Sequence, residues 1–421
     1  MRKTLPIIAF LLSVALQVCA QQKNYDFQEG KLFYKITDAT KQYVQVTTEM
    51  DELVEATGTL YNNPIEGDIT IPANINHQGK QYTVTGIADN SFGGCNKVTS
   101  VSIPASVTEF GEQVFLSCTG MKYITVDKDN SVLKDVDGVL FDKSGNKLIA
   151  YPNMRATNYD IPEGTVELGA ASFFMCNEIK NINFPPTLKK IGMLAFGICS
   201  KMNEVTIPET VTDLGDFAFY NCTGLEKAII KANISELKRY MFSRCTALKE
   251  VSLPSTIEFI RTWAFGSCAA MKNIKLPDNL KGIEAEAFNG CETLSEITLP
   301  ASLEQIGMYT FDGCKQLKCI TCLRDTPLKG AAMGAGVFEN VDKIACELKV
   351  PKGHRNEYAE AEQWGDFTRI SEHDLSGIST IISQDSNTQP TIFTINGQRL
   401  PNNTQPSHGI YIINGKKICV K

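Results

Sequence analysis

Apolar residues recur along this chain at a fixed spacing. A phenylalanine followed three residues later by a cysteine occurs nine times, as in Phe219 and Cys222. The same step separates successive copies, for example from Cys199 to Cys222 and on to Cys245, and only the step from Cys118 to Cys176 is longer. Self-similarity at a fixed period is the sequence signature of a repeat protein. The spacing therefore predicts a stack of similar 23-residue units, interrupted once.

Each unit also predicts a short strand. Stretches such as "EVTIP" and "EITLP" alternate apolar and polar residues, which is typical of a strand with one buried face. Proline ends these stretches because it has no N–H to donate to a sheet. A unit this short cannot bury its own apolar side, so neighbouring units must share a continuous core. The predicted fold class is a β-rich repeat solenoid.

The repeats resemble the leucine-rich repeats of the BspA-like type. The resemblance lies in stretches such as "TIPETVTDLGDFAFYNC", "SLPSTIEFIRTWAFGSC" and "TLPASLEQIGMYTFDGC", and it covers about residues 80–370. The extra residues of the long step contain "DGVLF" and "LIAYP", which resemble a hairpin insertion of that family. The stretch "LKVPKGHRNEYAEAEQW" resembles its closing segment. The resemblance implies a surface protein of Bacteroidetes type that adheres to host proteins or to other bacterial cells.

The first twenty residues read as a signal peptide. Arg2 and Lys3 precede an apolar stretch from Leu5 to Val18, which is too short for a membrane-spanning helix. The small Ala20 then suits cleavage. The alternative is a lipid anchor on Cys19, which the bulky Val18 disfavours. Export, to the medium or the outer cell surface, is therefore expected.

The sequence divides into five segments. The tail carries the turn signals Asn396-Gly397 and Asn414-Gly415 and resembles the C-terminal sorting tails of exported Bacteroidetes proteins, although a purely structural hairpin is an equal alternative. The expected segments are a signal peptide (1–20), a β-rich N-terminal cap (21–85), the solenoid (86–370, with a hairpin insertion at about 127–155 and the closing segment at 346–370), a polar linker (371–390) and a C-terminal β hairpin (391–421).

Composition narrows the function classes. The net charge of −6 argues against a nucleic-acid partner, and no second apolar segment is long enough to span a membrane. Four scattered histidines make a histidine-rich metal site improbable. No motif for catalysis, for a metal or for a cofactor is present, so we expect no catalytic residues, no metal ligands and no cofactor. The stretch Asp127–Gly138 resembles a calcium loop but has Val132 where glycine is needed, so we interpret it as a turn.

The cysteine column admits three interpretations. A chain of metal sites fails because no second ligand accompanies each copy. A ladder of disulfides fails because equivalent cysteines have two identical neighbours and do not pair off. We therefore expect buried structural thiols that pack as small apolar groups. These are Cys95, Cys118, Cys176, Cys199, Cys222, Cys245, Cys268, Cys291 and Cys314. Whether Cys346 forms a disulfide with Cys319 or Cys322 stays open.

The outward residues of the predicted strands form the candidate binding face, because solenoids bind through such extended surfaces. No aromatic stripe is seen on this face, where Tyr123 stands alone. The candidate residues are Lys122, Tyr123, Lys180, Asn203, Glu204, Glu226, Lys249, Glu250, Lys272, Lys275 and Lys318. We expect a non-enzymatic protein that binds an extracellular protein, of the host matrix or of another cell surface. The alternative is a cell-surface protein that binds glycans.

Overall fold

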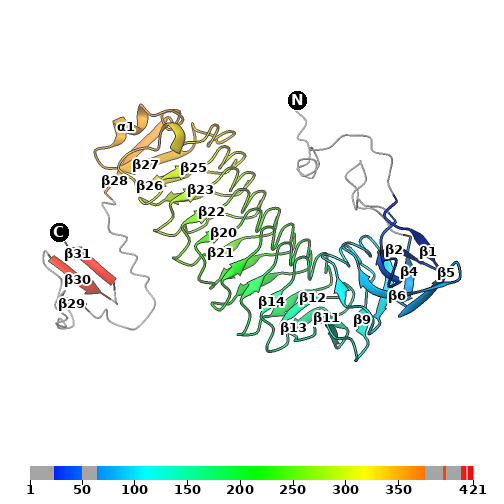
Figure 1. Cartoon of the computed structure of the whole chain (residues 1–421). Coiled ribbons are helices and arrows are strands. Elements are labelled where there is room, and N and C mark those ends of the chain that lie inside the picture. Colours follow the sequence, from blue (N-terminus) through cyan, green and yellow to red (C-terminus); the bar gives the residue numbers. More distant parts are fainter. Residues whose placement is uncertain (1–22, 50–63, 375–391, 395–408, 414–415, 421) are drawn as a thin grey trace.

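The computed structural model describes residues 23–49, 64–374, 392–394, 409–413 and 416–420. The chain winds into an elongated solenoid of about 13 turns, in which successive coils lie side by side (Figure 1). The 23-residue period therefore corresponds to one coil, as the apolar columns predict. Most coils have two short strands and a side made of turns, and the apolar columns meet between them.

The first strands of the coils form a row of four parallel sheets, here called the first ladder. This row is interrupted at the hairpin, between β15 (Asn181–Asn183) and β17 (Glu204–Ile207), and at residues 271–277, where no strand forms. The register advances by one repeat unit per coil, so that Glu204 pairs with Lys227 and Lys227 with Glu250. Inward and outward residues alternate, as in β17, where Val205 and Ile207 are buried. The other members are β4 (Glu66–Thr70), β7 (Lys97–Ile103), β9 (Tyr123–Val126), β13 (Asn158–Asp160), β15 (Asn181–Asn183), β19 (Lys227–Ile230), β21 (Glu250–Ser252), β24 (Glu296–Leu299), β26 (Cys319–Cys322), β27 (Glu347–Pro351) and β28 (Arg369–His373).

A second ladder consists mostly of two-residue strands. Leu214, Leu237 and Ile260 are buried on this side of the coil. Two residues are too few to show an alternating pattern, so the sequence did not predict these strands. They are β8 (Glu109–Phe110), β14 (Glu167–Leu168), β16 (Lys190–Ile191), β18 (Asp213–Leu214), β20 (Glu236–Leu237), β22 (Phe259–Ile260), β23 (Gly282–Ile283) and β25 (Gln305–Ile306).

The turn side carries the phenylalanine column. The rings of Phe196, Phe219 and Phe242 stack with centroids 5.2 and 5.5 Å apart and are fully buried. The residues two before and two after each phenylalanine adopt positive φ, for example Leu194 at 56° and Ile198 at 62°. This conformation is uncommon outside glycine, but it lets the backbone bond to the next coil. Each buried phenylalanine contributes roughly 1.5–3 kcal/mol of transfer free energy.

The N-terminal end differs from the expected cap at residues 21–85. A sheet with the order β1 (Phe27–Glu29), β2 (Leu32–Asp38), β3 (Tyr43–Thr47), β6 (Lys80–Ile87) and β5 (Asn74–His77) does cover this end. However, β4 already pairs in parallel with β7, and β6 pairs with β8. The solenoid ladders thus begin inside the range expected for the cap.

A hairpin interrupts the stack once, near the place that the long step predicts. It consists of β10 (Leu133–Val136), β11 (Val139–Asp142) and β12 (Lys147–Ala150), and β12 joins the second ladder beside β14. The core divides here into two apolar clusters. Leu140 belongs to the N-terminal cluster, whereas Val139 and Phe141 belong to the other. Strand β11 therefore separates two cores.

The C-terminal end closes with different packing. Trp364 and Phe367 contact Phe338 edge-on, which ends the stack of parallel rings. The closing elements are η2 (Gly330–Ala332), β27, α1 (Arg355–Ala359) and β28. Residues 371–373, expected in the linker, form part of β28 and pair with β27.

The tail contains three antiparallel strands rather than one hairpin: β29 (Ile392–Thr394), β30 (Gly409–Ile413) and β31 (Lys416–Val420). The expected signal peptide, Cys19 and most of the linker lie outside the described residues.

Candidate binding surface

Nine of the eleven candidate residues lie in or directly before strands of the first side of the coils, whereas Lys272 and Lys275 lie in the equivalent segment 271–277, which forms no strand. The surface that these eleven residues occupy is here called the strand face. All of them are exposed. Lys249, Lys272 and Lys318 occupy one column because their register repeats every coil, and neighbouring strands lie about 4.8 Å apart. Lys122, Tyr123 and Lys180 lie toward the hairpin, and Tyr123 is 43% exposed. The strand face is thus a polar surface many coils long.

Several candidate residues are paired with their neighbours instead of standing free. Lys249 Nζ lies 2.9 Å from Glu226 Oε2, and Lys227 Nζ lies 3.4 Å from Glu250 Oε2 on the next coil. Amide ladders add to this, since Asn181 Nδ2 donates to Asn158 Oδ1 at 2.7 Å. Exposed pairs of this kind stabilise little but cancel charge locally. Among the described residues, by contrast, no ion pair involves the lysines at 122, 180, 272, 275 and 318.

An aromatic stack on the turn side was missed by the sequence reasoning. Phe217, Tyr240 and Trp263 stack in parallel across three coils, with centroids 4.5 and 6.1 Å apart. All three stand two residues before a column phenylalanine. Aligning that column at the repeat period would have found them. The rings cover each other's faces, so the stack offers little platform for a sugar ring.

The column thiols are buried and form no disulfide, and each one from Cys118 onward donates a hydrogen bond to the preceding coil. Cys222 Sγ donates to the carbonyl oxygen of Phe196 at 3.0 Å, and Cys245 Sγ donates to that of Phe219 at 3.2 Å. Burial raises the pKa of the Cys291 thiol to about 12. A thiol is small enough for the core and still offers a weak donor, which accounts for cysteine at this position.

Cys319, Cys322 and Cys346 are free thiols in the structure. Cys319 is half-buried and faces outward, whereas Cys322 is buried on the other side of β26. Residues three apart on a strand point to opposite faces, so this pair cannot share a ligand. No disulfide joins either residue to Cys346.

Within the described ranges, no group of three or more histidine, cysteine or acidic side chains is placed to hold a metal ion. The stretch Asp127–Gly138 is built around Asn130, which is fully buried. Its Nδ2 donates to the carbonyl oxygens of Pro104 and Val107, both at 2.9 Å. Its side chain thus anchors the loop to the preceding coil. None of the helices in the described ranges has the length and apolar character that crossing a membrane requires.

The family model for the BspA-type leucine-rich repeat region matches residues 68–146, 147–272 and 264–357, in six copies. The chain belongs to this family. The BspA-type repeats thus span most of the chain, including the hairpin. Repeat scaffolds of this kind are typically non-enzymatic and bind proteins in general.

The chain is also similar to solved structures. A leucine-rich repeat protein from Eubacterium ventriosum matches at 21% identity and a TM-score of 0.52, covering 68% of this chain and 93% of its own. A leucine-rich cell surface protein from Faecalibacterium prausnitzii matches at 21% identity and a TM-score of 0.37, covering 70% and 94%. The first likeness shows a leucine-rich repeat solenoid fold. No curated protein sequence matches the chain.

Proposed function

We propose that this BspA-type protein is an exported, non-enzymatic adhesion protein that binds an extracellular protein through its strand face. The supporting observation is the row of parallel sheets along the solenoid, which displays exposed polar side chains at the same position in successive coils. A repeated surface of this kind suits an extended partner, because each coil adds a similar set of contacts.

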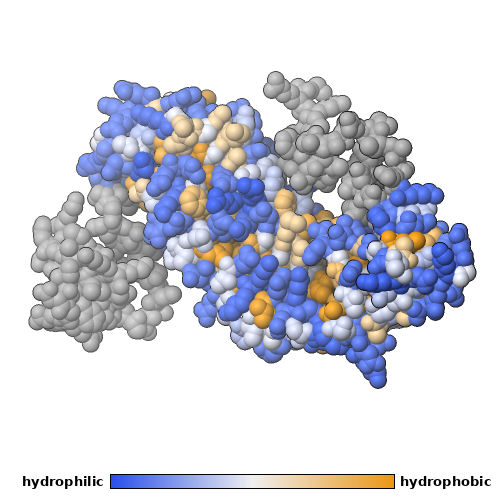
Figure 2. All heavy atoms as spheres, viewed as in Figure 1, coloured by the Kyte–Doolittle hydropathy of each residue, from blue (hydrophilic) through white to orange (hydrophobic). Residues whose placement is uncertain are grey.

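The distribution of charge points to the contact region. Lys272, Lys275 and Lys318 are exposed lysines without an ion pair among the described residues, and they lie on nearby coils. The view in Figure 2 is largely hydrophilic, with only small separate apolar patches. Binding there therefore relies on polar and charged contacts, and an acidic stretch of the partner would suit these lysines.

The direct test is binding of immobilised residues 21–421 to extracellular-matrix proteins and to a glycan array. We expect binding to at least one matrix protein, weakened by salt because exposed charges are screened. The double variant Lys272→Glu/Lys318→Glu should reduce that binding at least tenfold. The control Lys189→Glu/Lys329→Glu makes the same charge change at exposed positions outside the strand face and should leave binding unchanged.

Three results would count against the proposal. Equal loss in both double variants would show a dependence on net charge, not on the strand face. Binding to glycans without binding to any protein would favour the glycan alternative expected from the sequence. Turnover of a peptide or glycan by the purified protein would exclude the non-enzymatic role.

A further inference from the structure

Three main-chain N–H groups in one coil lack the partners that their equivalents have in the regular coils. In a regular coil, three main-chain N–H groups donate to carbonyl oxygens of the next coil. They belong to the column phenylalanine, to the residue two before it and to the residue two after it. For Phe219 these bonds measure 2.9 Å (Phe217 to Arg239), 3.0 Å (Phe219 to Met241) and 2.8 Å (Asn221 to Ser243). In the coil of Phe115, the N–H groups of Gln113, Phe115 and Ser117 have no acceptor within the part of the chain that is described.

The hairpin causes this gap. The chain returns from the hairpin as residues 147–154, and these complete the coil that follows. Tyr151 N–H donates to the carbonyl oxygen of Ser172 at 2.8 Å, and Asn153 Nδ2 donates to the carbonyl oxygen of Phe174 at 2.8 Å. The Tyr151 ring also stacks on Phe173, with centroids 4.8 Å apart. The returning segment thus bonds mainly to the coil after it. Its main-chain bond to the coil before it, from Met154 N–H to the Met121 carbonyl oxygen at 2.8 Å, lies beyond Ser117 and leaves the three N–H groups without acceptors.

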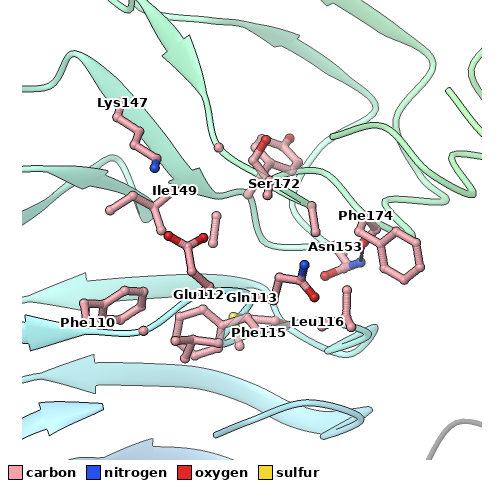
Figure 3. A pocket seen from close by; sticks show the side chains of 18 residues that line it. Phe110, Glu112, Gln113, Phe115, Leu116, Lys147, Ile149, Asn153, Ser172 and Phe174 are labelled. Atoms are coloured by element: carbon pink, nitrogen blue, oxygen red, sulfur yellow. Dashed lines mark hydrogen bonds between the residues drawn. The ribbon is translucent and has the colours of Figure 1, made fainter. Parts of the chain in front are cut away.

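A cleft of about 120 Å³ lies at this junction. Figure 3 shows Glu112 and Gln113 pointing into it from one side and Asn153 from the other. Phe115, which lines the cleft, is only partly buried, whereas the other eight phenylalanines of its column are fully buried. The cleft therefore combines unpaired backbone donors with an accessible aromatic ring.

We propose that this cleft binds an extended peptide segment of a partner protein. In the regular coils the acceptors are alternate carbonyl oxygens of one stretch of chain, such as those of Arg239, Met241 and Ser243. A peptide with the same spacing completes the interrupted ladder, by the same physics as strand addition to an open sheet edge. An apolar side chain of the peptide packs on Phe115. Glu112 is exposed and has no ion pair among the described residues, which favours a basic side chain beside it.

This site is separate from the strand face and does not depend on adhesion through it. The probe is a phage-displayed library of random octapeptides selected on the intact protein. Ala170→Arg fills the cleft from the opposite wall, and Met193→Arg makes the same insertion at the equivalent, exposed position one coil later. We expect selected synthetic peptides to bind at least tenfold more weakly to Ala170→Arg and within twofold of wild type to Met193→Arg. Bound peptide should also slow amide exchange in residues 112–118.

A second variant tests the site without inserting a bulky side chain into the cleft. Glu112→Arg alters an exposed side chain and should weaken basic peptides several-fold, and Glu209→Arg makes the same charge change at an exposed position of a regular coil. Unfolding curves of all four variants verify their folds. Selected peptides that bind wild type, Ala170→Arg and Glu112→Arg equally would overturn the proposal, as would a library that yields no binder. Charge reversal at Lys272 and Lys318 leaves this binding intact, so the two proposals fail separately.

Discussion

The regular coils and the hairpin junction are built from the same repeat but satisfy their backbone differently. Around Phe219, each coil is covered on both sides, and its ring lies between Phe196 and Phe242. Around Phe115, the ring contacts Phe92 at 5.5 Å on one side but no column ring on the other. The comparison shows that one insertion, placed between two coils, opens a site in an otherwise closed stack.

The largest expected difference concerns the two phenylalanines. Phe219→Ala removes a fully buried ring stacked on both sides and should lower the free energy of unfolding by about 3–5 kcal/mol. Phe115→Ala removes a partly exposed ring and should cost less than half as much. Urea unfolding of both variants measures the difference. Equal costs would mean that the junction is packed as tightly as a regular coil.

The cysteine column tests whether the coil of Phe115 is open only on the side of the cleft. On its other side, toward Phe92, this coil should be as stable as a regular coil. Cys245→Ala deletes a buried sulfur and its bond to Phe219 oxygen, so we expect a loss of about 1–2 kcal/mol. Cys118→Ala should cost a similar amount, because Cys118 Sγ donates back to Phe92 oxygen at 2.9 Å, away from the cleft. The same unfolding experiment applies. A Cys118→Ala variant with wild-type stability would contradict a one-sided opening.

A smaller effect is expected from a charge network in the regular coils. Arg261 Nε donates to Glu236 at 2.6 Å and its Nη1 donates to Glu284 at 2.7 Å. Partial burial raises the pKa of Glu284, but hydrogen bonds from Arg261 and Thr262 outweigh it and leave the pKa lowered. The pKa of Glu236 is lowered in the same way, by Lys238 and Arg261. The network therefore stabilises the fold at pH values above about 4.3, the glutamate pKa in the unfolded chain. This stabilisation is lost as the pH falls through the lowered pKa values of the folded protein.

Arg261→Gln tests this pH dependence. We expect a loss of about 0.5–1 kcal/mol at pH 7 and almost none near pH 2, since the side chains are partly exposed. Lys147→Gln, at the junction, breaks only a pair at 3.3 Å and should change stability less at either pH. Thermal unfolding at several pH values measures both. A pH-independent loss in Arg261→Gln would assign its role to packing.

The sequence predicted the repeated core positions and the place of the insertion, but not the cleft that the insertion opens. The columns that contain Phe219 and Cys222 identify core positions, because the residue at each of these positions is buried among equivalent neighbours in every regular coil. The cleft beside Phe115 could not be predicted, because it depends on how far residues 147–154 return across the stack, which no periodic column records. The partners of Lys249 were also missed, since they are set by the register between coils.

The most direct measurement is amide hydrogen exchange of the free protein, comparing Phe115 with Phe219. The Phe219 N–H is bonded inside the stack and exchanges only after opening of its coil, so we expect exchange at least about 10³-fold slower than at Phe115. Gln113 and Ser117 should follow Phe115, and Phe217 and Asn221 should follow Phe219. Equal, strong protection at both sets of amides would contradict the account, because it would show that the junction is already closed.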